Sequence, residues 1–318
     1  MTPPVAVAVV SWNTRELLMA CLESLALEAE AGRAEVWVVD NASTDGSPEE
    51  VADRFEWVTL VAAGENLGFG AAVNHVAART QTEFIAPANA DVALEPGALE
   101  LLLAAAAAHP EAGAVAPRLV LADGTTQHSV HPFPSLTAAS VLNLGLVRLL
   151  PRLGDRLCLH GAWDPDRPRE VDWALGAFLL VRRSAWDEVG GFDTAQWMYT
   201  EDLDLGWRLA QAGRPTRYVP AARVRHRSEA STQQAWCGGV ADRWQALTYT
   251  WTLRRRGAAF TRALALISLA GAAFRLAAFG VLARLRPARF GPPRDAARAW
   301  LRRHRAGLAP RAELERLR

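Results

Sequence analysis

The chain has 318 residues, of which half are hydrophobic and 22% are charged, and its formal net charge is +1. This composition excludes a disordered chain, and the length allows one large α/β domain or two small ones with a buried core. The three cysteines are far apart, which excludes a disulfide scaffold and a cysteine metal site and favours a reducing compartment. The N-terminus lacks the basic segment and cleavage site of a signal peptide, so we expect none.

Strands and helices are predicted to alternate over the first half of the chain. Apolar segments predict strands at residues 5–10, 36–39, 58–62 and 84–86, and helical spacing predicts helices at residues 14–29, 69–79 and 96–108. This order predicts an α/β fold with a doubly wound, mostly parallel sheet and helices on both faces.

The second half of the chain is less regular. Several prolines between residues 120 and 170 predict loops with short elements, and residues 177–181 and 216–219 have the composition of strands. A helix is predicted over residues 201–212 and ends at Gly213.

Short polar segments follow the predicted strands at their carboxyl ends, where a sheet of this kind binds ligands. They contain Ser11, Trp12, Asn13, Asp40, Asn41, Asn66, Asn89 and Asp91. The carboxylate of Asp40 fits hydrogen bonding to a nucleobase or ribose, or an Asx turn that caps the next helix. The turn with Gly68 and Gly70 fits either backbone amides near a diphosphate or close packing of a helix on the sheet.

Three further motifs each allow a catalytic and a structural interpretation. Asn89 and Asp91 could share a hard divalent cation with substrate phosphates, or form a polar loop. Glu201 and Asp202 begin a helix, where a carboxylate could act as a general base that the helix dipole keeps ionised, or simply complement that dipole. His226 is either a metal ligand or a surface histidine.

Together these segments resemble the family 2 inverting glycosyltransferases of the GT-A fold over about residues 5–230. The matching motifs are Val9-Val10-Ser11-Trp12-Asn13, Asp40-Asn41-Ala42-Ser43-Thr44-Asp45-Gly46-Ser47, Asn66-Leu67-Gly68-Phe69-Gly70, Asn89-Ala90-Asp91, Gly176-Ala177-Phe178-Leu179-Leu180, Gly190-Gly191-Phe192-Asp193 and Met198-Tyr199-Thr200-Glu201-Asp202-Leu203-Asp204-Leu205.

The resemblance implies a role for each motif. The donor-binding residues would be Ser11, Trp12, Asn13, Asp40, Asn41, Asn66, Gly68, Gly70, Asn89 and Ala90. Asp91, with His226, would hold Mg²⁺ or Mn²⁺, although Asn89 stands where many relatives have the first aspartate of an Asp-x-Asp motif. Asp202 would be the catalytic base with Glu201 beside it, and the acceptor would contact Trp173, Gly176 and Trp197.

The implied reaction moves a sugar from a nucleotide-diphosphate sugar to a hydroxyl of a glycan or polyprenyl-linked acceptor, with inversion. Residues 11–13 and 123–134 look most like rhamnosyltransferases of cell-wall or O-antigen assembly, which favours dTDP-rhamnose over a UDP-sugar. The resemblance places the transferase domain at residues 1–250, with a nucleotide-sugar half at about 1–118 and an acceptor half at about 119–250.

Two other functions remain open at this point. A nucleotidyltransferase usually has a glycine-rich loop with a basic residue after the first strand, and residues 11–15 provide no such loop. A catalytically silent nucleotide-sugar-binding paralogue would not need the pair Glu201 and Asp202, which argues against it.

The C-terminal segment 251–318 differs from the rest in charge. Residues 1–253 carry 19 arginines and 31 acidic residues, whereas residues 254–318 carry 16 arginines and three acidic residues. The longest uncharged run, 263–274, is shorter than a membrane span, so we expect a helical tail on the anionic inner face of the plasma membrane of a cytoplasmic enzyme. The alternative is a helical appendage packed on the domain or on a second subunit. Nucleic-acid binding is disfavoured by the apolar stretches and the acidic body.

Overall fold

The computed structural model describes residues 3–196, 200–227 and 240–310, and it divides into two compact units. We call the first, Met1–His131 with Pro165–Cys237, unit 1, and the second, Pro132–Asp164 with Gly238–Arg318, unit 2. Each unit is described by itself.

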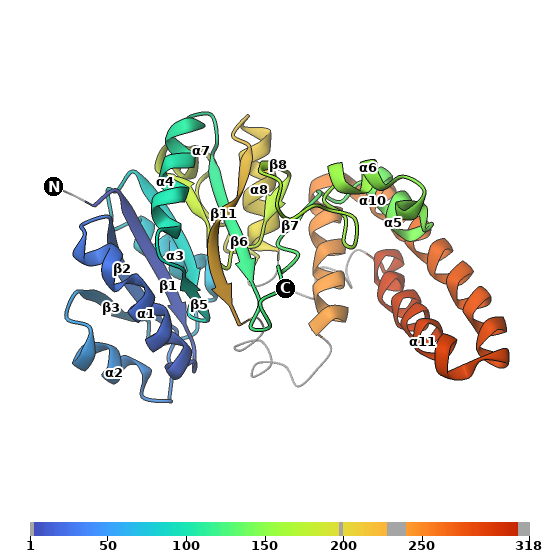
Figure 1. The fold of residues 1–318 in the computed structure, drawn as a ribbon, viewed down its shortest axis with the longest axis horizontal. Helices are drawn as coiled ribbons and strands as arrows, with labels where there is room; N and C mark the ends of the chain where they lie inside the picture. The colour runs from blue at the N-terminus through green and yellow to red at the C-terminus, as the bar shows by residue number, and fades with distance from the viewer. Residues whose placement is uncertain (1–2, 197–199, 228–239, 311–318) are drawn as a thin grey trace. The chain divides into compact units, whose positions relative to one another are not determined.

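Unit 1 begins with strands and helices in alternation (Figure 1). Its first elements are β1 (Val5–Ser11), α1 (Arg15–Glu30), β2 (Ala34–Asp40), α2 (Ser47–Arg54), β3 (Val58–Ala62), α3 (Phe69–Ala77), β4 (Phe84–Asn89), β5 (Val92–Leu94), α4 (Ala98–Ala108) and β6 (Ala114–Val120). The predicted strands and helices of this half are confirmed within a few residues. The short strand β5, together with α2 and β6, was not predicted.

The remaining elements of unit 1 complete the sheet. They are β7 (Val130–His131), β8 (Arg169–Val171), β9 (Trp173–Ala174), β10 (Leu180–Arg182), α7 (Arg183–Val189), α8 (Glu201–Gln211) and β11 (Thr216–His226). The main sheet runs β3-β2-β1-β4-β10-β6-β11-β5, with β8 paired to β11, while β7 and β9 form a separate two-stranded antiparallel sheet. Strands β1 to β4 are parallel to one another, as are β6 and β11, so the mostly parallel sheet is confirmed.

The register of the parallel strands brings their polar ends together. Ser11 at the end of β1 lies opposite Asp40 at the end of β2, and Val10 lies opposite Asn89 at the end of β4. The core beneath this edge is apolar because β1 buries its valines against α1, whose Leu22 is fully buried. Burial on both faces explains the unbroken apolar run of β1.

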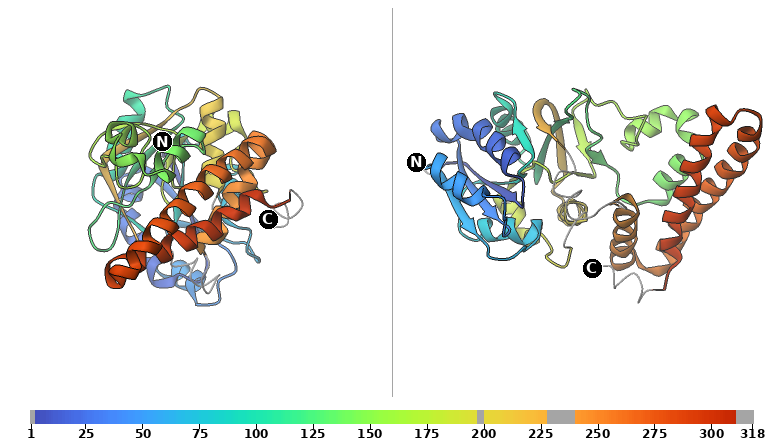
Figure 2. Two further views of the ribbon diagram at one scale, coloured as in Figure 1. Left: turned by 90° about the vertical axis from the view of Figure 1, so that its right-hand side faces the viewer. Right: turned by 90° about the horizontal axis from the view of Figure 1, so that it is seen from below.

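Unit 2 is helical (Figure 2). It consists of α5 (Leu136–Asn143), a 3₁₀ turn η1 (Leu146–Arg148), α6 (Pro151–Arg156), α10 (Val240–Leu285), α11 (Pro287–His304) and a second 3₁₀ turn η2 (Arg305–Leu308). Helix α10 is interrupted at Gly257, whose φ of 82° is left-handed. Its second half packs against α11 and α5, so the predicted helical tail is confirmed.

Asn143 is the polar centre of unit 2. Its side-chain nitrogen donates to the Ser268 hydroxyl of α10, and its side-chain oxygen accepts from the indole nitrogen of Trp300 in α11 at 2.8 Å. Gly271 has no room for a side chain, because a Cβ there would lie 2.1 Å from the Asn143 carbonyl oxygen. These contacts join α5, α10 and α11 into one unit.

Candidate active site

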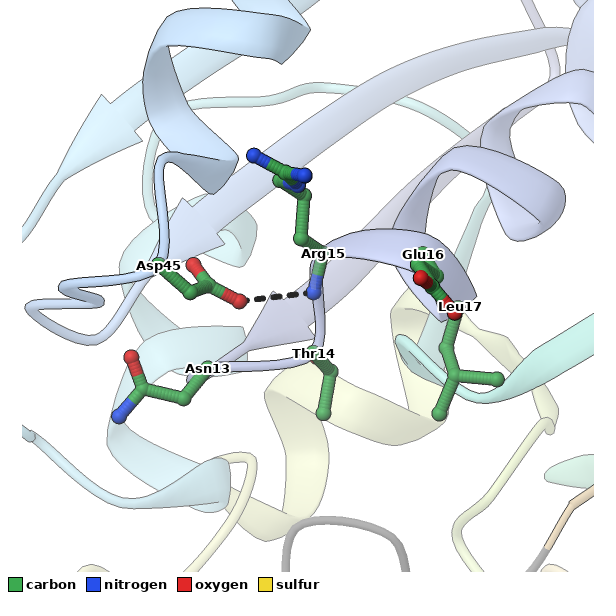
Figure 3. Close-up of a pocket in the computed structure, with 6 residues that line it drawn as sticks. All are labelled: Asn13, Thr14, Arg15, Glu16, Leu17 and Asp45. Carbon is green, nitrogen blue, oxygen red and sulfur yellow. Dashed lines mark hydrogen bonds between the residues drawn. The ribbon is translucent and has the colours of Figure 1, made fainter.

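The loops after β1 and β2 are joined by hydrogen bonds (Figure 3). The Asn13 amide donates to the Ser43 hydroxyl at 2.9 Å, and the Asn13 side-chain oxygen accepts from the Thr44 amide at 2.8 Å. The Arg15 amide at the start of α1 donates to the Asp45 carboxylate at 2.9 Å. These hydrogen bonds therefore hold the loops at residues 11–15 and 40–47 together at the carboxyl edge of the sheet.

A pocket of about 370 Å³ opens beside these loops, at the N-terminus of α1 (Figure 3). It is lined by Asn13, Thr14, Arg15, Glu16, Leu17 and Asp45. Neither Asp91 nor Asp202 lines it, so this pocket does not contain the predicted catalytic residues.

Asp40 makes a local contact and also has an unpaired oxygen. Its Oδ2 accepts from the Ser43 amide at 2.9 Å, a bond within the loop that does not cap α2, and its Oδ1 is buried without a hydrogen-bond partner. The side-chain oxygen of the neighbouring Asn41 is also buried and unpaired. Buried acceptors without partners are costly to the fold, so these two oxygens point to hydrogen-bond donors on a ligand.

The turn before α3 is held by a local hydrogen bond and by packing. The Asn66 side chain accepts from the Gly68 amide at 3.0 Å, and Gly68 has a φ of 79°. A Cβ on Gly70 would lie 2.9 Å from the Cβ of Phe192. Gly70 therefore has a packing reason to be glycine, which was the structural alternative for this motif.

Asp91 and His226 lie together, although 135 positions separate them in the sequence. His226 Nε2 is 3.3 Å from Asp91 Oδ1, and both side chains are more than nine-tenths buried. The contact exists because the end of β11 pairs with β5, which directly follows Asp91. Asp91 Oδ1 receives no hydrogen bond.

Gln127 fixes the ring of His226. Its side-chain oxygen lies 2.7 Å from His226 Nδ1, and Nε2 is the ring nitrogen that faces Asp91. In the tautomer with the proton on Nδ1, Nε2 and Asp91 Oδ1 are both electron-rich, an arrangement that suits a cation bound to both atoms. Gln127 was missed at the sequence level, because a single glutamine in a loop carries no motif.

The residues Gly176 and Ala177 connect this loop to the predicted base. The Ala177 carbonyl oxygen accepts from the Asn89 amide at 2.9 Å, and the Gly176 amide donates to Asp202 Oδ2 at 3.1 Å. A Cβ on Gly176 would be 3.4 Å from the Asp202 Cβ and 3.6 Å from the Phe69 ring at the start of α3. The motifs at residues 66–70, 89–91, 176–177 and 201–202 therefore converge.

Asp202 and Glu201 are both buried, and their environments separate their pKa values. Burial raises the pKa of Asp202 to about 6. The backbone amides of Gly176 and Leu203 donate to its carboxylate and have the opposite, smaller effect on this pKa. Burial, and then the charge of Asp202, raises the pKa of Glu201 to about 8. From the sequence, the helix dipole was expected to keep the carboxylate of the base ionised, whereas burial acts in the opposite direction. Burial favours the protonated form of both carboxyls, and the pKa of Glu201 is raised further by the charge of Asp202.

The predicted acceptor residues have different surroundings. Trp173 is only 3% exposed, its ring stacks on His131 at 4.7 Å, and its Cβ occupies the space beside Gly206 of α8. This burial leaves little of the Trp173 ring for an acceptor sugar and makes it a support for the adjacent Gly176 segment. Trp197 lies outside the described residues.

The chemistry of Asp91 and His226 fits a divalent cation. Among residues 3–196, 200–227 and 240–310, no cluster of three or more histidine, cysteine, aspartate or glutamate residues could hold a metal ion by itself. Two protein ligands suffice for Mg²⁺ when substrate phosphates and water supply the rest. The unbonded Asp91 oxygen and His226 Nε2 would be those two ligands.

Comparison with known proteins agrees with this geometry. Residues 6–151 match the family described as Glycosyl transferase family 2, and residues 90–293 match Glycosyl transferase family group 2. The chain is 37% identical over 247 residues to N-acetylglucosaminyl-diphospho-decaprenol L-rhamnosyltransferase of Mycobacterium tuberculosis, covering 73% of this chain and 78% of that protein. It is also 50% identical over 56 residues to Rhamnosyltransferase WbbL of Escherichia coli, covering 18% of this chain and 21% of that protein.

A solved structure shows the same fold. Mannosyltransferase PcManGT from Pyrobaculum calidifontis, in complex with GDP-Man and Mn²⁺, superposes with a TM-score of 0.57 at 19% identity, covering 97% of this chain and 86% of that chain. The GT-A fold implied by the sequence resemblance is confirmed by this likeness.

Proposed function

This chain belongs to glycosyltransferase family 2, and we propose that it transfers L-rhamnose from dTDP-rhamnose to a sugar hydroxyl of a polyprenyl-diphosphate-linked acceptor, with inversion. The rhamnosyl group and the lipid-linked acceptor follow from the name of the mycobacterial relative, and dTDP-rhamnose follows from the resemblance of residues 11–13 and 123–134 to rhamnosyltransferases. Family membership excludes the nucleotidyltransferase alternative. A UDP-sugar is the second choice of donor.

The observation that carries this proposal is the position of Asp202. Its carboxylate is buried, receives two backbone hydrogen bonds and adjoins the segment that contacts the Asn89 loop. A base in this position can take the proton of the acceptor hydroxyl while that oxygen attacks the anomeric carbon. The new bond forms as the bond between that carbon and the diphosphate oxygen breaks, so the configuration inverts. Burial raises the pKa of Glu201, which disfavours a second negative charge beside Asp202.

The donor would bind along the carboxyl edge of the sheet. Asp40 Oδ1 and Asn41 Oδ1 would accept hydrogen bonds from N–H and O–H groups of the nucleoside, which would satisfy both buried oxygens. Ser11, Trp12 and Asn13 would form the neighbouring wall. The diphosphate would lie near Asn66, Gly68 and Gly70, with Asn89 and Ala90 beneath it.

Asp91 and His226 would hold the divalent cation, Mg²⁺ or Mn²⁺. Such an ion would neutralise the negative charge that develops on the diphosphate leaving group. Gln127 is a positioning residue in this scheme, because it keeps the proton of His226 on Nδ1 and leaves Nε2 free.

The acceptor would approach from the side of Gly176, a segment that the neighbouring Trp173 supports. An acceptor on a polyprenyl lipid would place the enzyme at the cytoplasmic face of the plasma membrane. The arginine-rich C-terminal residues 251–318 would supply attraction to anionic lipid.

A thermal-shift panel tests the donor assignment. The full chain is melted with dTDP-, UDP- and GDP-sugars, each with and without Mg²⁺ or Mn²⁺. A ligand that binds the native state raises Tm, and we expect the largest, metal-dependent rise with dTDP-rhamnose. An equal rise with all three nucleotides, or none with any, would count against the donor assignment.

A further inference from the structure

The second half of α10 has an apolar face that no described part of the chain covers. Six of its exposed residues share this face, at steps of three or four residues apart from one adjacent pair; they are Leu266, Ala270, Ala273, Phe274, Ala277 and Val281. We call these six residues the outward stripe. Leu266, Phe274 and Val281 are 56%, 73% and 61% exposed. A helix on the surface of a soluble protein normally turns polar residues outward.

The stripe is part of a wider excess of exposed apolar side chains on unit 2. Among the described residues, 13 large hydrophobic side chains are exposed, and ten of them belong to unit 2. The opposite side of α10 is already used, since Ala265 and Ala272 are fully buried and the helix packs on α11 and α5. An apolar face of this extent indicates an interaction surface.

Positive charge surrounds the stripe. Arg262 and Arg284 are exposed at its two ends, and α11, which lies along α10 (Figures 1 and 2), exposes Arg298 and Arg302. Unit 2 as a whole carries 20 arginines and six acidic residues. The matching partner is apolar inside and anionic at its surface, which describes a bilayer containing acidic lipids. A second copy of this chain would instead bring like charges together.

Helix α10 does not suit a membrane span, although its length and apolar composition would allow one. The stripe from Leu266 to Val281 extends about 22 Å, short of the roughly 30 Å of hydrocarbon in a bilayer. Helix α11 packs along α10, so a spanning α10 would carry the arginines of α11 into hydrocarbon. If α10 instead lies parallel to the membrane plane, the arginines of α11 stay in water or among lipid headgroups.

We propose that unit 2 docks on the surface of an anionic bilayer, with the outward stripe of α10 in the interfacial layer and the arginines at its ends on lipid headgroups. The proposal rests on the proposed function only for the expectation that the acceptor is lipid-linked. It adds the face that binds and the orientation of α10, parallel to the membrane plane.

Vesicle co-sedimentation of the full chain tests this surface. The vesicles contain phosphatidylcholine alone or phosphatidylcholine with phosphatidylglycerol, and the variants are the double change Leu266→Gln with Phe274→Gln and the control Leu27→Gln. Leu27 is 64% exposed on α1 of unit 1, so the control removes the same kind of side chain elsewhere. We expect the wild type and control to bind the anionic vesicles, and the double variant to bind them at least about tenfold more weakly.

Three results would overturn the proposal. One is equal vesicle binding by the double variant and the wild type. Another is a wild-type dimer that becomes a monomer in the double variant, seen by light scattering, without any vesicle effect. The third is wild-type protein that stays in native membranes after alkaline carbonate extraction, which would indicate a span. Circular dichroism shows whether the variants are folded, and the assay uses no sugar donor, so its outcome is separate from that of the transferase proposal.

Discussion

The residues that suggest a function are of opposite kinds in the two units. In unit 1 they are polar and buried, and oxygens of Asp40, Asn41, Asp91 and Glu201 receive no hydrogen bond. In unit 2 the informative atoms are apolar and exposed, along α10. Folding alone favours neither arrangement, since one leaves acceptors unsatisfied and the other leaves apolar surface in water. These two arrangements are the basis of our proposals of ligand binding in unit 1 and surface binding in unit 2.

The largest expected effect comes from Asp202. The change Asp202→Asn removes the proton acceptor, so we expect kcat to fall by about 10²–10⁴-fold while donor binding persists. In the wild type, kcat/KM should rise with pH through the pKa of about 6, because only the ionised carboxylate accepts the proton. Steady-state kinetics across pH measure both effects. Glu188→Gln, an exposed carboxylate of α7, is the control, and normal turnover in Asp202→Asn would remove the base assignment.

The second-largest expected effect is on metal affinity, and it tests the contact between Gln127 and His226. Gln127→Leu removes the acceptor for Nδ1–H, so we expect Mn²⁺ affinity, measured by calorimetry with dTDP present, to fall about 10–100-fold. Gln127→Glu keeps an acceptor oxygen and should retain affinity. The ¹⁵N shifts of His226 provide a second readout, since only the leucine variant should lose the Nδ1–H tautomer. Unchanged shifts and affinity in Gln127→Leu would contradict the positioning role.

A third prediction concerns stability and the buried carboxyl of Glu201. Its folded-state pKa of about 8 lies above the ordinary value of 4.5, so the native state binds the proton more tightly and stability falls as pH rises between these values. Glu201→Gln has no such proton to lose. The variant should therefore gain about 3 kcal/mol over the wild type near pH 7 and little near pH 4. Urea unfolding at several pH values measures this difference, and parallel pH curves for the two proteins would refute it.

The smallest expected effects are on stability, at a glycine of unit 1 that has no room for a Cβ and at a glycine of unit 2 that has open space around it. Gly70→Ala places a Cβ 2.9 Å from that of Phe192, so we expect a loss of about 1–3 kcal/mol of stability. Gly280→Ala in α10 has open space and should gain about 0.5–1 kcal/mol from helix propensity. Thermal unfolding measures both. A stable Gly70→Ala with weakened donor binding would favour the diphosphate role over packing.

Much of the fold and part of the site follow from local sequence. The apolar runs of β1 and β2 predict buried parallel strands, and parallel register then places Ser11 opposite Asp40. The contact of Asp91 with His226 was anticipated from the resemblance, but its geometry depends on the pairing of β11 with β5, a strand of three residues too short for periodicity to reveal.

Other features depend on tertiary packing and had no sequence signal. Gln127 meets His226 across 99 positions, and nothing in its own segment indicates that contact. The tryptophan at 173 was expected to face a sugar, yet the absence of a side chain at Gly206 lets it pack into α8. The pKa of Asp202 was expected to follow the helix dipole, whereas the depth of its burial could be known only from the fold.

The most direct test of the account is a transfer reaction analysed for stereochemistry. The full chain is incubated with dTDP-rhamnose, an N-acetylglucosamine linked to a polyprenyl diphosphate, and Mg²⁺, and the product is examined by NMR at the anomeric centre. We expect a rhamnosylated lipid whose anomeric configuration is opposite to that of the donor. Retention of the donor configuration would contradict single displacement with Asp202 as base, and the absence of rhamnosyl transfer would contradict the substrate assignment.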